Sequence, residues 1–148
     1  MFVDLMNRLL GEAPQPDPQG DYRRSLAALL VRCARIDDDY APTERMRIDR
    51  ILASRYGLDD TEAAALRAEG EALEHEAGDT VHLTRAIKDG VPYDERGAIV
   101  EALWSVALAD ADRDHAENAF LRLVVKLLGV NDVDSGLARQ RAQDRRAS

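Results

Sequence analysis

Residues 30–44 read LVRCARIDDDYAPTE, and residues 103–117, at an offset of 73 positions, read LWSVALADADRDHAE. In both stretches an apolar helical pattern runs into an acidic turn, after which a new helical pattern begins. The identical pairs are Leu30 and Leu103, Ala34 and Ala107, Asp37 and Asp110, Asp39 and Asp112, and Glu44 and Glu117. This repeat predicts two equivalent helical hairpins, at residues 25–57 and 98–129.

The first hairpin carries clear helix signals. One buried stripe is indicated by apolar residues spaced at i, i+3, i+4 and i+7, namely Leu26, Leu29, Leu30 and Cys33. Pro42 suits the first position of the following helix, and Gly57 is typical of its end. Gly129 takes the same place in the second hairpin after a shift of one residue.

Helical patterns also fill the rest of the chain. Residues 59–77, with Gly70 on the inner face, residues 80–90 and residues 92–109 each predict a helix, and the tail from Asn131 predicts a frayed helix rich in Arg. Aromatic residues make up 5% of the chain, so the core consists mainly of Leu, Ile, Val and Ala, which suits packed helices. The predicted fold class is all-α, a compact bundle of seven or eight helices.

The length of 148 residues and the hydrophobic content of 45% fit one domain. We expect an N-terminal arm and Pro-rich linker at 1–20, a helical domain at 21–138 and a basic C-terminal tail at 139–148. Within the arm, residues 1–10 form an amphipathic pattern with one apolar side made of Phe2, Leu5, Met6 and Leu9. The arm is expected to pack on its own domain; a partner, a second copy of the chain or a membrane surface is the alternative.

The charge balance is acidic, with 20 Lys and Arg against 28 Asp and Glu and a net charge of −8. This balance argues against nucleic acid as a partner and favours a basic protein or a cation. Acidic side chains are concentrated between residues 59 and 79, a run that we interpret as a solvated helix face.

The single cysteine, Cys33, lies in an apolar run and is expected in the core, so it supports neither a disulfide nor a thiolate metal site within one chain. The N-terminus lacks a small-residue cleavage site, and the sequence has no apolar run of about 18 residues. We therefore expect a cytoplasmic protein that does not insert directly into a membrane.

Residues 33–63, CARIDDDYAPTERMRIDRILASRYGLDDTEA, and residues 83–130 resemble the tellurite-resistance protein TerB family, which also includes the N-terminal domain of the DjlA co-chaperone. The most specific stretch is ERGAIVEALWSVALADADRDHAE at 95–117. The similarity covers roughly residues 21–138. It implies a compact bundle of about seven helices with pseudo-twofold halves and an association with tellurite and general stress resistance beside membrane and metal-linked partners. It implies no enzymatic activity.

The resemblance also assigns two sets of acidic positions, one in each hairpin. The first set is Asp37, Asp39 and Glu44, and the second is Asp110, Asp112, Asp114 and Glu117. The chain departs from the family pattern where Asp38 and Ala111 replace a glycine and where Ala41 replaces an acidic residue. Because Ala41 removes one potential oxygen ligand, the first acidic turn is expected to be the weaker site.

Helix capping explains part of this pattern. Asp114 and Glu117 form a D-x-x-E capping box, worth on the order of 1 kcal/mol, and Glu44 can act similarly without a capping side chain. Capping does not explain Asp37 and Asp110, which continue the buried stripe of their helices at carboxyl ends, where the helix dipole disfavours an anion. A hydrogen bond to the following turn, an arginine from the opposite half or a cation would offset this cost.

The spacing Asp110-x-Asp112-x-Asp114 is similar to the start of an EF-hand loop, but His115 and Leu121 stand where that loop needs Gly and Glu. The sequence therefore does not predict an EF-hand. An irregular oxygen site for Ca²⁺, Mg²⁺ or Mn²⁺ is the interpretation that remains, whereas tight zinc binding would have only His115 as a local nitrogen ligand.

Sequence signals for catalysis are weak. The chain has no Gly-rich phosphate loop, no H-E-x-x-H and no G-x-S-x-G motif, and His75 and His82 are separated by a turn signal and expected on the surface. We predict a non-catalytic interaction module that binds a cation or a partner protein, with membrane-associated stress-resistance proteins suggested by the resemblance and a second copy as a further candidate. The alternative is a carboxylate-based enzyme of unknown substrate, which requires a pocket of carboxylates with displaced pKa values.

Overall fold

The computed structural model describes residues 18–36, 40–108 and 115–147. These residues form seven α-helices and no strand. The helices are α2 Pro18–Ala34, α3 Pro42–Tyr56, α4 Asp60–Glu76, α5 Thr80–Gly90, α6 Tyr93–Ala107, α7 His115–Leu128 and α8 Asp132–Ala147. The predicted all-α class is confirmed.

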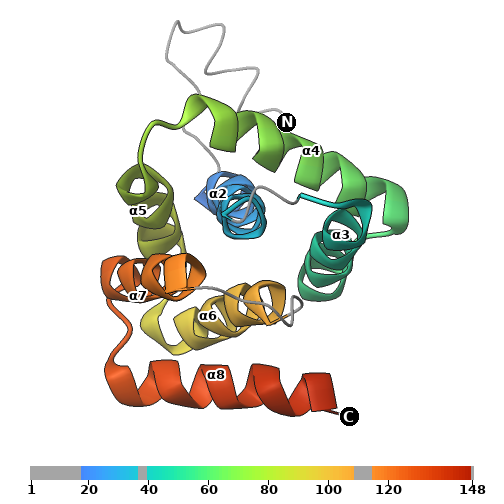
Figure 1. Ribbon diagram of the computed structural model, residues 1–148. Coiled ribbons are helices and arrows are strands. Elements are labelled where there is room, and N and C mark those ends of the chain that lie inside the picture. The colour runs from blue at the N-terminus through green and yellow to red at the C-terminus, as the bar shows by residue number, and fades with distance from the viewer. Residues whose placement is uncertain (1–17, 37–39, 109–114, 148) are drawn as a thin grey trace, which may run out of the picture.

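Helix α2 lies at the centre of the bundle. Figure 1 looks along its axis and shows α4 above α2, α5 to its left, α3 to its right, and α6 and α7 below it. Helix α2 contacts all five. Because neighbours cover α2 on every side, burial is not confined to the predicted stripe: each residue from Leu26 to Val31 is 0% exposed. Cys33 is also buried, as expected.

Helix α4 crosses close to α2 at Gly70. A Cβ atom at Gly70 would lie 2.5 Å from the Cβ of Ala27 and 2.9 Å from the backbone nitrogen of Ala28. Only a residue without a side chain lets the two backbones come this close. The predicted position of Gly70 on the inner face of its helix is confirmed.

Local sequence signals set the helix ends. Asp59 begins α4 with a capping box, accepting from the amide of Glu62 at 2.7 Å while the Glu62 carboxylate accepts from the amide of Asp59 at 3.1 Å. Gly57 (φ 63°) follows α3 and Gly129 (φ 74°) follows α7, and both adopt the left-handed conformation that glycine tolerates best. The two glycines thus stop the second helix of each hairpin in the same way. The pseudo-twofold relation between the hairpins stays a prediction.

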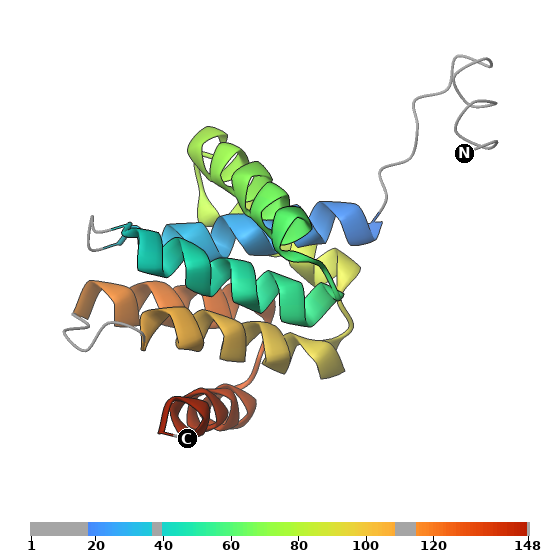
Figure 2. The same cartoon turned by 90° about the vertical axis from the view of Figure 1, so that its right-hand side faces the viewer.

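The C-terminal region differs from the expected frayed helix. Helix α8 is continuous through most of the predicted basic tail and packs along α6 at the edge of the bundle (Figures 1 and 2). Ala138 and Ala142 are buried against α6. None of the helices in the described part of the chain is long and apolar enough to cross a membrane.

Polar contacts attach α8 to α6. The buried carboxylate of Glu101 accepts a hydrogen bond from Arg141 Nε at 2.9 Å and pairs with Arg145 Nε at 3.0 Å. The Arg139 guanidinium lies 4.7 Å from the centroid of the Trp104 ring, a cation–π contact. These contacts explain why a tail with few apolar residues still forms a packed helix.

Candidate functional site

Most of the predicted site residues lie outside the described residues, namely Asp37, Asp39, Asp110, Asp112 and Asp114. The backbone of Glu117 belongs to α7, but its side chain is also outside the description. Glu44 lies in the first turn of α3, where the helix dipole favours an acidic side chain, and the N-cap residue of that helix, Ala41, makes no side-chain capping bond. The metal hypothesis for these residues therefore stays a prediction.

The helix ends that flank the two acidic turns lie at one end of the molecule. Figure 2 shows the carboxyl ends of α2 and α6 and the amino ends of α3 and α7 on the same side. Both segments predicted to be sites, 37–39 and 110–114, connect helices at this end. Within the described ranges, no group of three or more His, Cys, Asp or Glu side chains could hold a metal ion.

A cluster of cationic side chains surrounds Tyr40, the residue that follows the first acidic turn. The guanidinium carbons of Arg35 and Arg45 lie 5.0 and 4.9 Å from the centroid of the Tyr40 ring. Burial, and next the negative charge of Glu71, raise the pKa of the Tyr40 hydroxyl. Tyr40 is therefore a neutral side chain whose ring lies against two positive charges at neutral pH.

A second group of charges joins α3 to α4. Arg67 Nε pairs with Asp49 Oδ1 at 2.6 Å, and Arg67 also pairs with Glu71 one turn further along α4. Burial alone would lower the pKa of Arg67, but the hydrogen bond to Asp49 and the charges of Asp49 and Glu71 outweigh that effect and raise it. This network holds the second helix of the first hairpin against α4.

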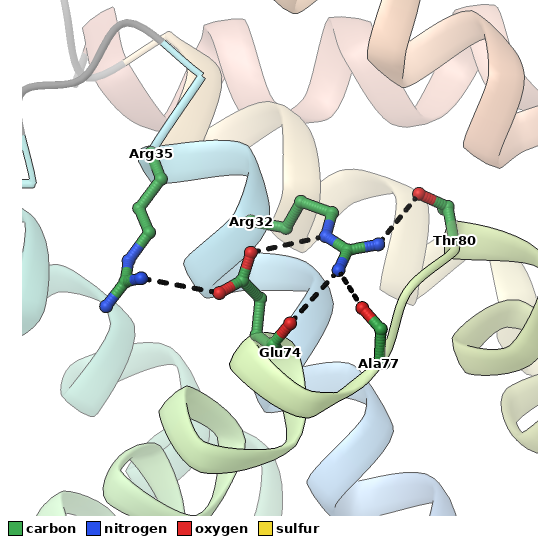
Figure 3. A network of polar contacts seen from close by, with 5 residues as sticks. All are labelled: Arg32, Arg35, Glu74, Ala77 and Thr80. Atoms are coloured by element: carbon green, nitrogen blue, oxygen red, sulfur yellow. Dashed lines mark hydrogen bonds and ion pairs between the residues drawn. The ribbon is translucent and has the colours of Figure 1, made fainter.

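Arg32 fastens the junction of α4 and α5 to α2 (Figure 3). Its Nη2 donates to the carbonyl oxygens of Glu74 at 3.1 Å and Ala77 at 2.8 Å, and its Nη1 donates to Thr80 Oγ1 at 3.1 Å. The Glu74 carboxylate pairs with Arg32 at 3.3 Å and with Arg35 at 3.4 Å. The interpretation of the acidic run at 59–79 as a solvated helix face is therefore wrong for two of its residues. Glu71 pairs with Arg67, and Glu74 pairs with Arg32 and Arg35.

A groove of about 790 Å³ opens between α2, α4 and α5. It is lined by Arg24, Ser25, Glu69, Ala72, Leu73, Glu76, His82, Arg85, Ala86, Asp89 and Gly90. His82 and His75 are both exposed, as predicted. Apolar side chains form part of the groove wall, and both positively and negatively charged side chains line the rest of it.

Comparison with known families identifies this helical arrangement. Residues 23–140, from the second turn of α2 to the middle of α8, match the family described as Tellurite resistance protein TerB. The chain belongs to the TerB family. No curated protein and no solved structure gives a significant match.

The TerB match includes both hairpins and about the first half of α8, and it supports the family resemblance seen in the sequence. The sequence did not predict Arg32 and Arg35 as ion-pair partners of Glu74, because Glu74 lies about 40 residues further along the chain in α4. The only local signal was their place beside the acidic run Asp37 to Asp39. The groove between α2, α4 and α5 had no sequence signal, since three separate helices line it.

Proposed function

We propose that this TerB-family chain is a non-catalytic module in tellurite or general stress resistance, and that its acidic turns bind a hard divalent cation weakly. The observation that supports the proposal is the common location of the four helix ends that flank the turns (Figure 2). Carboxylates attached there would lie near the negative ends of the α2 and α6 dipoles, and a cation would convert repulsion into attraction.

The second turn is proposed as the better site. It carries Asp110, Asp112 and Asp114, with Glu117 in the first turn of α7. The first turn offers Asp37, Asp39 and Glu44, and it is followed by Tyr40, whose ring contacts Arg35 and Arg45. A guanidinium group acts over about 10 Å at 0.1 M salt, so the two arginines oppose a second cation at the first turn.

Thermal melts with added metal test this function. The turns offer too few protein oxygens for a full shell, so water must complete it and the Kd should be about 10⁻⁴ to 10⁻³ M. At ten times the Kd, Ca²⁺, Mg²⁺ or Mn²⁺ should stabilise the fold by roughly 1.4 kcal/mol through mass action. Asp110→Asn should remove this stabilisation and Asp37→Asn should reduce it less.

Asp144→Asn, in exposed helix α8, is the matched control and should respond to metal like the wild type. If millimolar cations leave the melting curve unchanged, or move the wild type and Asp110→Asn alike, the cation proposal fails. A basic protein partner for the acidic end, recovered with the wild type and lost with Asp110→Asn, would then replace it. Turnover of a substrate at ordinary enzyme rates would overturn the non-catalytic part.

A further inference from the structure

The outer side of α8 carries an apolar patch. Figures 1 and 2 show α8 at the edge of the bundle, with α6 on one side of it and no other labelled helix on the far side. Val133 and Leu137 are 72% and 53% exposed, and they lie one turn apart on the side of α8 turned away from the buried Ala142. A Cβ atom at Gly136, between them, would meet nothing within 4 Å. The described part of the chain therefore leaves this outer face of α8, formed by residues 133, 136 and 137, uncovered.

The other large exposed apolar side chains of the described residues do not form such a patch. Met46, Val81 and Leu123 lie on three different helices, α3, α5 and α7. Tyr93 of α6, which is 40% exposed, lines the same hollow of about 290 Å³ as Leu137 and so adjoins the outer face of α8. Single exposed apolar side chains are ordinary on a protein surface, whereas a group of them indicates an interaction surface.

Two charges lie along one edge of this face at the heptad spacing of paired helices. Asp132 and Arg139 are seven residues apart, so they lie two turns from each other on the same side of α8. Neither forms an ion pair within the described ranges, and the Arg139 guanidinium rests on the Trp104 ring. An identical helix can satisfy both charges only if it runs in the opposite direction, because a parallel copy would place like charges opposite each other.

We propose that the outer face of α8 binds a second copy of this chain, with the two α8 helices antiparallel about a twofold axis. The midpoint of Asp132 and Arg139 falls between positions 135 and 136, so an axis there brings Asp132 of each copy opposite Arg139 of the other. The midpoint of Val133 and Leu137 falls at position 135, so the same axis brings Val133 of each copy opposite Leu137 of the other. The apolar pairs and the charged pairs therefore require the same register.

The dimer should be weak. Two turns of helix bury less than the roughly 1,200 Å² at which stable interfaces begin, so association should depend on protein concentration. Because Asp132 and Arg139 are exposed, salt should weaken it further. The proposal does not rest on cation binding, which concerns the turns at 37–39 and 110–114. Measurements in EDTA therefore test the dimer alone, and the two proposals can fail separately.

Sedimentation velocity of the full chain, at protein concentrations from about 10 μM to about 1 mM, tests the association. The average mass should rise from the 16.4 kDa of one chain toward twice that value. Leu137→Asp places a charge in the contact and should raise the Kd at least about tenfold. Met46→Asp makes the same kind of change at an exposed apolar position of α3, 56% exposed, and should leave the Kd unchanged.

Charge reversal tests the register. Asp132→Arg or Arg139→Asp alone sets like charges opposite each other and should raise the Kd about tenfold. The variant with both substitutions restores opposite charges and should return to within about threefold of the wild-type Kd. Because the double variant carries the local effects of both single changes on α8, its recovery would show that the charges act across the interface.

A chain that stays monomeric at the highest concentration would overturn the proposal, and so would a Leu137→Asp protein that associates like the wild type. A double charge variant that does not recover would reject the antiparallel register. If the chain is monomeric in solution but binds vesicles of anionic phospholipid, and Leu137→Asp abolishes that binding, the outer face of α8 belongs to a membrane surface and the second copy is rejected.

Discussion

Helices α2 and α8 have nearly the same length, 17 and 16 residues, but different forces hold them in the fold. Helix α2 is enclosed by five helices, and its residues Leu26–Val31 have no exposed surface. Helix α8 packs mainly against α6, leaves Val133 72% and Leu137 53% exposed, and relies on three arginines. We therefore expect the apolar centre around α2 to accept almost no added side-chain volume and the polar edge formed by α8 to tolerate substitutions.

Glycine substitutions expose this difference most strongly. Gly70→Ala forces a methyl group against Ala27 at 2.5 Å, where backbone atoms also lie within 3 Å, and should destabilise the fold by about 1–3 kcal/mol through overpacking. Gly136→Ala in α8 meets nothing within 4 Å and should stabilise the helix by about 0.5–1 kcal/mol. Chemical denaturation of both variants measures the two effects, which have opposite signs.

The two variants carry the same chemical change in two helix interiors, so each controls for the helix propensity of the other. A Gly70→Ala protein as stable as the wild type would show that α4 can move away from α2 at little cost. The close crossing would then not be what fixes the position of α4, and the contrast between centre and edge would disappear.

The same contrast explains how much of the fold could be predicted. The apolar spacing around Leu29 and Leu30 and the stop signals at Gly57 and Gly129 are local, and they predicted the helices and their hairpin order. The tail was predicted to be a frayed helix rich in Arg. Its helix depends on Glu101 and Trp104 of α6, and a pairing across some 40 residues leaves no periodic signal in the sequence.

The candidate site divides in a similar way. Acidic residues at matched positions of a repeat can be read from the sequence, and Glu44 lies in the first helical turn as capping rules require. The shared contact of Arg35 and Arg45 with the Tyr40 ring could not be predicted, because the two arginines lie ten residues apart in the chain and meet this ring only in the folded structure. The unequal strength assigned to the two turns therefore rests on tertiary structure as well as on Ala41.

Removal of the buried charge of Glu101 should loosen the edge and spare the centre. Glu101→Gln keeps the shape of the side chain but weakens the bonds to Arg141 and Arg145, so amide hydrogens of α8 should exchange about tenfold faster, equivalent to roughly 1.4 kcal/mol of local opening. Because both arginine side chains are largely exposed, high salt should reduce the difference between variant and wild type.

Asp144→Asn is the control for this experiment. It makes the same carboxylate-to-amide change at an exposed position of α8 that pairs only with Gln140 in the described structure, and it should leave exchange in α8 nearly unaltered. Faster exchange in α2 as well as in α8 after Glu101→Gln would mean that the two helices open as one unit. The separation of centre and edge would then be wrong.

The smallest predicted effect is a loss of stability at alkaline pH, which arises where α3 contacts the amino-terminal part of α2. The Tyr56 ring of α3 packs edge-on against Tyr22 at 6.0 Å and lies 4.6 Å from the Arg23 guanidinium, and burial raises the pKa of its hydroxyl above the usual value although Arg55 opposes this shift. A tyrosine with a raised pKa in the folded state contributes stability that is complete below pH 10 and is lost as the pH rises through the folded pKa.

Above pH 10 the free energy of unfolding of the wild type should therefore fall by roughly 0.5 kcal/mol per pH unit more than that of Tyr56→Phe. This is less than the limit of about 1.4 kcal/mol per pH unit, because solvent reaches part of the ring. Urea unfolding at pH 8, 10 and 11 measures this loss, and at pH 8 the two proteins should be nearly equally stable because the ring contacts remain. Parallel curves for the two proteins above pH 10 would show that the Tyr56 hydroxyl ionises without opposing the contact between α2 and α3.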